Sequence, residues 1–549
     1  MNKKYRIGAS LLGFILLSTG AMVGCGGNGG GTTSDGEVKE VQIGVVSKGY
    51  GNEFAKALAE AYNKTQTGVK VVVKKTTPTA TYQDTQLQLG KKKNKIDIFF
   101  TVTNTVFSTQ SDATLYHWAD LSDVYDSVAV GYAEADGVKT IEDLLDPSFV
   151  RDFTYSDDKQ YSIPWTSGVV GLLYNKTKWD ATNANLKSAG KEELTLPKTT
   201  DEMFALFDKI KTDDVKSASG NAYAFSYSGQ NSYMHFMFNS LWPQYEGKTA
   251  SENFFEGKNE QGVYTADIYN TKGREYAYDI IRSMILKSNG YVSDGDSTQT
   301  YDQEQLSFLR GNALFSCNGD WMEREASANF NPGDADVVLL RTPVMSEIVN
   351  NEKIAADFTG TDAEKDAKLS AIVSFIDGNY IDGESEPTEA DATSLGVSLT
   401  TLEFIHHARL VRHTLPDFVA VIPEYSAELE EAKDFLKFVY SKAGQEIVMQ
   451  ETYGCGAPLT VDYSQMDYYQ NGTYYTRSRL DLIKESIPYG NAMNFPMEYL
   501  GRIMACAELK IASAFGTTSP KSAATFMKEE YDDYKTTWDT KMELSGVRN

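Results

Sequence analysis

Hydrophobic and polar positions near the start of the chain recur with two different periods. Residues 37–46 read EVKEVQIGVV, in which apolar side chains occupy every second position, as in a half-buried strand. Residues 52–66 place apolar side chains three or four positions apart, which is typical of one face of a helix. Two more apolar strands, 68–75 and 95–102, enclose a helical segment at 81–93. This β-α-β-α-β order predicts a parallel sheet covered by helices.

A second α/β region is expected after about residue 160. An apolar stretch lies within residues 159–179, and Thr199 and Glu202 are spaced as a capping box at the start of a helical pattern. Further helical patterns follow at 276–290, 431–450, 507–516 and 521–538. Between about 347 and 405 an acidic stretch rich in Gly, Asp and Glu contains one helical pattern, 363–378, and we interpret it as an insertion or a peripheral cap.

Polar and aromatic residues follow several of the expected strands. Tyr50 follows the first strand, Asn104 follows the strand at 95–102, and Asp320 and Trp321 follow the apolar run that ends at Cys317. Ligands of open parallel sheets bind outside the carboxyl ends of the strands. We expect Asp320 to cap a helix and Trp321 to lie in its first turn, facing a cleft.

Two more tryptophans, Trp165 and Trp242, are candidates for the same site. A sugar ring has an apolar C–H face that stacks on an aromatic ring, and covering about 60–80 Å² of it is worth roughly 1.5–2 kcal/mol. Asp, Asn, Ser and Thr side chains then orient the hydroxyl groups. The alternative for each aromatic residue is a position in the core or at its rim.

The N-terminus has the pattern of a secretion signal. Three cationic residues precede an apolar run that is too short to span a bilayer. The following AMVGC resembles the lipobox of bacterial lipoproteins, in which the cysteine, here Cys25, is lipidated. We expect residues 1–24 to be a signal peptide, residues 25–37 to be a flexible Gly-rich linker, and the protein to lie outside the cytoplasm, anchored to the cell membrane.

Charge and cysteine content limit the partners. The formal net charge of −24 repels nucleic acid and anionic lipid headgroups, so no nucleic-acid role is expected. Apart from Cys25 the chain has Cys317, Cys455 and Cys506, which cannot make a disulfide framework. At most one pair can form, and we expect buried free thiols.

Several longer segments are similar to one known family. They are YSIPWTSGVVGLLYNKTKW, FLRGNALFSCNGDWM, DADVVLLRTPV, the block from DFVAVIPEY to GCGAPLT, and NFPMEYLGRIMACAELKIASAFG. In order and spacing they resemble the maltose-binding-protein-like solute-binding proteins of bacterial carbohydrate ABC importers. The resemblance implies a two-lobed α/β fold of the periplasmic-binding-protein type II, a carbohydrate ligand between the lobes, delivery to ABC permease subunits, and a stacking role for Trp321.

The same resemblance implies a chain that crosses between the lobes about three times. The expected crossings lie near residues 163–164, 340–343 and 438–440. Lobe 1 would comprise 38–163 and 341–438, and lobe 2 would comprise 164–340 and 439–549.

Other functions find less support in the sequence. A surface glycosidase, the main alternative, needs two facing carboxylates, but acidic residues are too abundant here for a pair to be recognised. No nucleophile-elbow, zinc-protease or Cys-His signature is present, and the histidines 406, 407 and 413 lack partners at metal-ligand spacing. An adhesin would not need two α/β lobes. We therefore expect a monomeric, non-enzymatic binding protein without cofactor or metal.

Overall fold

A computed structural model describes residues 38–544, apart from 78, 80–81, 103–108, 111–112, 133–136, 156, 232, 255–256, 382–384, 416–417 and 490–509. The expected signal peptide and linker, Cys25, Asn104 and Cys506 lie outside the described residues. Among the helices within them, none combines the length and the apolar character needed to cross a membrane.

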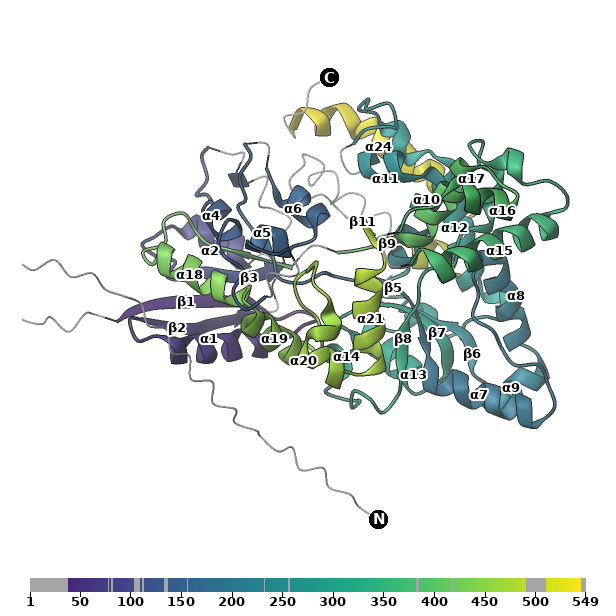
Figure 1. The fold of residues 1–549 in the computed structure, drawn as a ribbon, viewed down its shortest axis with the longest axis horizontal. Helices are drawn as coiled ribbons and strands as arrows, with labels where there is room; N and C mark the ends of the chain where they lie inside the picture. Colours follow the sequence, from purple (N-terminus) through teal and green to yellow (C-terminus); the bar gives the residue numbers. More distant parts are fainter. Residues whose placement is uncertain are drawn as a thin grey trace, which may run out of the picture. The chain divides into compact units, whose positions relative to one another are not determined.

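The first sheet contains the strands predicted near the start of the chain (Figure 1). Its order is β2-β1-β3-β10-β4, where β1 is Lys39–Val46, β2 Val69–Thr77, β3 Ile98–Val102, β4 Ile163–Pro164 and β10 Phe418–Val421. β1 pairs in parallel with β2 and β3, which confirms the predicted parallel core, whereas β10 runs antiparallel. The helices of this half are α1 Glu53–Thr65, α2 Tyr82–Leu89, α4 Ser122–Tyr125, α5 Ile141–Leu144, α6 Pro147–Phe153, α18 Leu429–Val439 and α19 Lys442–Glu451.

Neighbouring residues of β3 bury both faces of this sheet. Because successive strand side chains point to opposite faces, Phe99 and Phe100 cover different sides. Phe100 packs edge-on against Phe54 of α1, with ring centroids 5.4 Å apart, and Phe99 packs against Tyr82 of α2, at 6.0 Å. The two phenylalanines therefore attach α1 and α2 to opposite faces of the sheet.

The second sheet has the order β6-β7-β5-β8. β5 is Val170–Asn175, β6 Tyr223–Ser226, β7 Ala313–Gly319 and β8 Val337–Leu339. β7 is buried along its whole length and pairs in parallel with β6 and antiparallel with β5. The helices of this half are α7 Lys176–Ser188, α8 Thr200–Ile210, α9 Asp213–Ser219, α10 Met234–Glu246, α11 Lys248–Phe254, α12 Lys272–Ile285, α13 Tyr301–Leu309, α14 Met322–Ala326, α20 Asp467–Asn471, α21 Tyr474–Lys484, α23 Ile511–Phe515 and α24 Ala523–Leu544.

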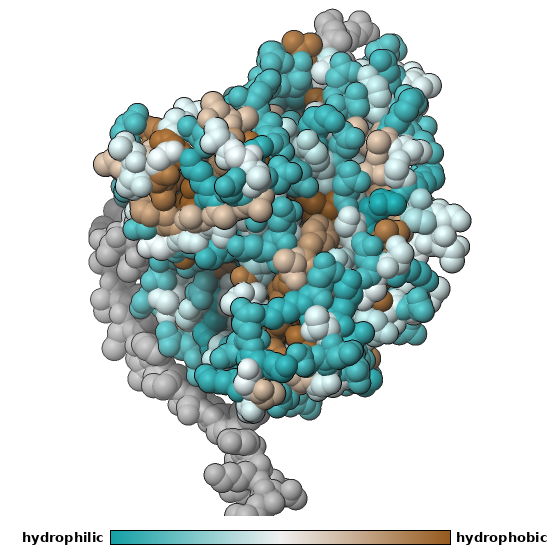
Figure 2. Space-filling view, turned by 90° about the vertical axis from the view of Figure 1, so that its right-hand side faces the viewer, coloured by the Kyte–Doolittle hydropathy of each residue, from teal (hydrophilic) through white to brown (hydrophobic). Residues whose placement is uncertain are grey.

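Residues 344–410 pack on the second half of the molecule. They form α15 Asp362–Asn379, α16 Glu389–Leu395 and α17 Leu399–Leu410, which enclose a hydrophobic core of their own. Ser370 of α15 donates to Glu202 of α8, and α17 contacts α10. In Figure 1 these helices lie beside α8 and α10, and Figure 2 shows this side of the molecule as mostly hydrophilic.

This placement differs from the expected lobe boundaries, which assigned residues 341–438 to lobe 1. The chain returns to the first sheet only between β9 (Val411–His413) and β10, not near residues 340–343, because the insertion stays on the helices of the second half. Likewise α19 packs on α1, and α21 packs on β8, so the last passage follows α19 instead of lying near 438–440. β9 pairs with β11 (Ile487–Tyr489) in a two-stranded ribbon.

The passages between the two sheets lie side by side. Ser167 N donates to Gly456 O at 2.8 Å, and Leu415 N donates to Gly168 O at 2.8 Å. Gly168 has a φ of +59°, and a Cβ at this position would lie 2.0 Å from the Leu415 carbonyl oxygen. Only glycine fits here, since it both accepts the left-handed backbone and lets the two segments approach.

Candidate ligand-binding site

The loop after β7 lies at the junction of the two halves. Asp320 N donates to Val169 O at 2.8 Å, and Tyr475 OH donates to Gly319 O at 2.7 Å. Trp321, and not Asp320, is the N-cap residue of α14, and it has helical backbone angles. The expected side-chain cap by Asp320 is therefore absent from this helix, because the carboxylate of Asp320 is used elsewhere.

Asp320 connects the two halves of the molecule. Its Oδ1 accepts a hydrogen bond from Tyr50 OH at 2.6 Å, and its Oδ2 accepts one from Val169 N at 3.3 Å. Its backbone carbonyl accepts from Arg479 at 2.5 Å, which ties α21 to the same loop. Burial raises the pKa of the Asp320 carboxyl, and Arg479 opposes that shift. Two of the predicted site residues, Tyr50 and Asp320, are thus in direct contact.

Trp321 is largely enclosed by other aromatic residues. Its side chain is 7% exposed, and Tyr50, Tyr233 and Phe236 surround it edge-on with ring centroids 6.2, 6.3 and 5.6 Å away. A Cβ on Gly319 would lie 2.3 Å from the indole, so the ring lies across the end of its own strand. The exposed platform expected from the sequence is covered in this conformation.

The other predicted tryptophans have different places. Trp165 is buried, stacks on Phe54 with centroids 4.3 Å apart, and contacts Tyr50 at 5.5 Å. Trp242 is also buried and packs against Phe254, with its Nε1 donating to Asn239 at 3.2 Å. It lies six residues further along α10 than Phe236, about 9 Å at 1.5 Å per residue, so it is separated from the aromatic group around Trp321.

Sequence reasoning missed two half-buried tyrosines, Tyr233 beside Trp321 and Tyr301 beside Tyr233. Their rings lie 6.3 Å apart with an interplanar angle of 30°. Tyr233 is the N-cap residue of α10, in the connection that follows β6, and Tyr301 begins α13. Because ligands bind beyond the carboxyl ends of strands, recognising residues 223–226 as a strand would have made Tyr233 a candidate.

Three carboxyl groups, two of them buried and one half-buried, lie on the two helices that begin at Tyr301 and directly after Trp321. Glu304 accepts from Ser226 and Ser316 at 3.0 and 2.6 Å, and burial raises its pKa to about 8. Glu323 accepts from Thr473 at 3.0 Å, and Glu325 from Gln305 at 2.7 Å. Burial raises the pKa of each of these two to about 7.

Because the pKa of each of these carboxyl groups is raised, we expect the protein to lose stability as the pH rises from about 5 to 8. An unfolded glutamate has a pKa of about 4.3, so over this range the folded protein holds protons that the unfolded chain has released. The free energy of unfolding then falls with pH by up to about 1.4 kcal/mol per pH unit for each group. Thermal unfolding at pH 5.5 and 8 measures the slope.

The matched variant is Glu304→Gln, which removes the group with the largest of the three shifts. We expect a smaller dependence of the melting temperature on pH than in the wild type. A control, Glu192→Gln, changes a fully exposed carboxylate and is expected to leave the dependence unchanged. Equal slopes in all three proteins would contradict the assignment.

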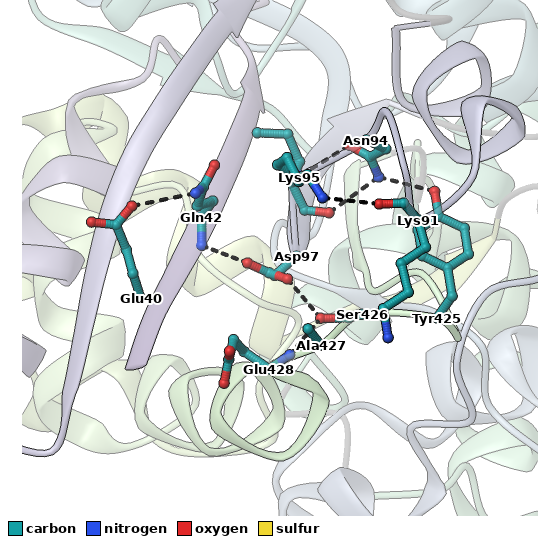
Figure 3. A pocket seen from close by; sticks show the side chains of 11 residues that line it. Glu40, Gln42, Lys91, Asn94, Lys95, Asp97, Tyr425, Ser426, Ala427 and Glu428 are labelled. Carbon is teal, nitrogen blue, oxygen red and sulfur yellow. Dashed lines mark hydrogen bonds between the residues drawn. The ribbon is translucent and has the colours of Figure 1, made fainter. Parts of the chain in front are cut away.

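A separate pocket of about 180 Å³ lies at the opposite end of the first sheet (Figure 3). Glu40, Gln42 and Asp97 line it at the start of β1 and just before β3, whereas Tyr50 follows the other end of β1. Asp97 already accepts hydrogen bonds from Gln42 N at 2.8 Å and from Ser426 at 2.7 Å. In the described part of the chain, no group of His, Cys, Asp and Glu residues is arranged to hold a metal ion.

The two cysteines that the structure describes are free and buried, as expected. Cys455 Sγ lies 3.0 Å from Arg479 Nη1 and 3.2 Å from the Asp320 carbonyl oxygen, and Cys317 lies within β7. Burial raises the pKa of both thiols well above the ordinary range, so neither has the character of a reactive thiolate.

Comparisons with known proteins give a consistent result. A family model of bacterial extracellular solute-binding proteins matches residues 48–345. A multiple sugar-binding protein of Streptococcus mutans is 24% identical over 166 residues, which cover 30% of this chain and only about a third (34%) of that relative.

Two solved structures have a similar fold. One is the GacH receptor of Streptomyces glaucescens, solved unliganded and with acarbose; it is 14% identical, has a TM-score of 0.55, and the match covers 93% of this chain and 99% of that one. The other is the Thermus thermophilus maltotriose binding protein with maltotriose, at 15% identity, a TM-score of 0.52, and coverage of 91% and 100%.

Proposed function

This chain belongs to the bacterial extracellular solute-binding protein family, and we propose that it binds a sugar or oligosaccharide between its two α/β halves. The family and the fold support a role in capturing a solute outside the cytoplasm. The sugar-binding relative and the acarbose- and maltotriose-bound structures support a carbohydrate as that solute.

The observation that supports the position of the site is the aromatic group at the carboxyl ends of β7 and β6. Tyr233, Tyr301 and Trp321 offer ring faces and edges, and the nearby carboxyl groups and Gln305 offer hydrogen-bond partners for hydroxyl groups. Together these are the two components that a sugar requires. Tyr50, Asp320 and Trp165 complete the group from the junction of the halves, and Asn104 and Trp242 stay proposals from the sequence.

The proposed lipid anchor would place the protein where it can deliver its ligand to a permease. Lipidated Cys25 and the linker of residues 25–37 would hold a monomeric protein at the membrane, where an ABC permease takes up the ligand. Contacts of the ligand with both halves favour a closed form by no more than the difference in its affinity for the closed and open forms. A permease that recognises the closed form would respond to loaded protein.

A sugar panel tests this proposal. Thermal shift and calorimetry with mono- and oligosaccharides should show stabilisation by at least one sugar, without release of hydrolysis products. Turnover of an oligosaccharide would support the glycosidase alternative instead, in which a carboxyl group with a raised pKa such as Glu325 serves as the acid.

Replacing Trp321 by alanine should weaken sugar binding about 10- to 100-fold, since an aromatic residue at the centre of an interface contributes about 1–3 kcal/mol. Calorimetry with the best sugar of the panel measures the change. The control is Trp118→Ala, which removes another buried tryptophan, from the first half of the molecule. Unchanged affinity in a folded Trp321→Ala protein would exclude Trp321 from the site. If that variant unfolds, the sugar affinity of Trp321→Phe, which keeps an aromatic ring, is compared with that of the wild type instead.

A further inference from the structure

Side chains from the two halves bind each other directly at the junction, outside the passages that connect the sheets. Tyr50, in the loop between β1 and α1, donates to Asp320, in the loop after β7, at 2.6 Å. The two residues are 270 positions apart in the sequence, and both are buried. This hydrogen bond therefore joins the two halves directly, side chain to side chain.

Both partners of this hydrogen bond are held in place by their own surroundings. The Tyr50 ring packs edge-on against Phe418 and Trp165, with centroids 4.6 and 5.5 Å away. In the second half of the molecule, Asp320 Oδ2 accepts a hydrogen bond from the backbone N–H of Val169. Because little side-chain freedom is left to lose, the contact has a low entropic cost of formation.

A second pair of side chains lies next to the first. Arg324 of α14 forms an ion pair with Glu53, the first residue of α1. Gly51, with a φ of +74°, lies against this pair: a Cβ there would be 2.5 Å from Arg324 Nη2 and 2.6 Å from Glu53 Oε2. Gly49, with a φ of +53°, approaches Trp321 in the same way, since a Cβ on this glycine would lie 3.1 Å from the Cβ of Trp321. The two glycines let the loop after β1 lie directly on the loop after β7.

We propose that Tyr50, Glu53, Asp320 and Arg324 form a latch that holds the two halves together before a ligand binds. In this state Tyr50 is fully buried and Trp321 is 7% exposed, so no ring of a ligand can stack on the indole. A ligand reaches Trp321 only after the Tyr50–Asp320 hydrogen bond has opened. The latch rests on contacts between the halves and does not depend on the ligand being a sugar.

The latch sets the fraction of molecules that can accept a ligand. If only an open fraction binds, the apparent dissociation constant equals the intrinsic constant divided by that fraction. A weaker latch therefore gives faster association and, when opening limits binding, a higher apparent affinity.

The test is the solution conformation of the unliganded protein. We would measure small-angle X-ray scattering and acrylamide quenching of tryptophan fluorescence for the wild type and for a Tyr50→Phe, Arg324→Gln double variant. Loss of a hydrogen bond to a buried carboxyl group should raise the open-to-closed ratio about tenfold or more. The wild type should scatter as the closed form, and the variant should show a larger radius of gyration and stronger quenching.

The matched control is Tyr291→Phe, which removes a tyrosine–carboxyl hydrogen bond (to Asp208, 3.0 Å) that lies within the second half alone. It should scatter like the wild type. An open unliganded wild type, or a double variant indistinguishable from the wild type, would overturn the latch. Should the double variant fold poorly, Glu53→Gln breaks only the ion pair at a half-exposed residue and is expected to shift the ratio in the same direction. A protein that binds no sugar but opens on mutation would refute the proposed ligand and keep the latch.

Discussion

Replacing Glu530 by glutamine is expected to lower the free energy of unfolding by about 3–5 kcal/mol, the usual cost of removing one partner of a buried ion pair. Glu530 of α24 accepts from Arg274 of α12 at 2.8 Å, and the two side chains are 2% and 0% exposed. The guanidinium also lies within about 6 Å of five aromatic rings, those of Phe238, Trp242, Phe254, Tyr269 and Tyr278. Without the carboxylate, a buried cation loses its counter-ion.

Urea unfolding measures the loss, and Asp532→Asn is its matched control. Asp532 lies two residues further along the same helix and forms an exposed ion pair with Lys528, which contributes at most about 1 kcal/mol. A loss below about 1 kcal/mol for Glu530→Gln would show that the aromatic rings and Tyr278 OH, which accepts from Arg274 Nη2 at 3.3 Å, stabilise the arginine without the carboxylate. In either case the experiment measures how firmly α24 is attached to α12.

Replacing Gly168 by alanine should destabilise the protein by about 2–5 kcal/mol. A left-handed conformation costs a non-glycine residue about 1–2 kcal/mol, and forcing extra atoms into a packed site costs about 1–3 kcal/mol more. The added Cβ would collide with a backbone carbonyl oxygen, that of Leu415, which cannot rotate away as a side chain would. The collision falls where the passages between the two sheets meet.

Gly190→Ala separates the two contributions to this loss. Gly190 has a similar φ of +65°, but no atom lies within 4 Å of the Cβ position, so alanine there should cost only the conformational part. The difference between the two variants in denaturant unfolding is the effect of close packing at the junction. Equal losses would mean that the segments around Gly168 move apart easily.

Local sequence was enough to predict many residues of the site, but it could not predict which of them contact each other or that Trp321 is buried. The glycines and the aromatic residue in the loop after β1, and the tryptophan in the loop after β7, are visible as strand-end features. Their mutual contact is not, because Tyr50 and Asp320 are 270 residues apart and meet only through the packing of the two halves. Trp321 therefore looks exposed in the sequence and is covered in the structure.

The lobe boundaries show the same limit. The apolar stripes of α15 and α17 are typical of packed helices, but a stripe does not identify its partner. Residues 344–410 have a core of their own and contact α8 and α10, so they stay with the second half and delay the return of the chain by about seventy residues. Similarity to a family with a shorter chain suggested a crossing before the insertion instead of after it.

The sequence by itself determined the α/β class, the parallel core of the first sheet, the acidic surface and the family of the protein. These depend on periodicity, composition and motif order, which are properties of neighbouring residues. The tertiary structure decided which aromatic residues meet at the junction, which half accommodates the insertion, and that the tryptophan after β7 is enclosed by Tyr50. Those outcomes depend on packing between segments hundreds of residues apart, where shape and burial select one partner among many of equal hydrophobicity.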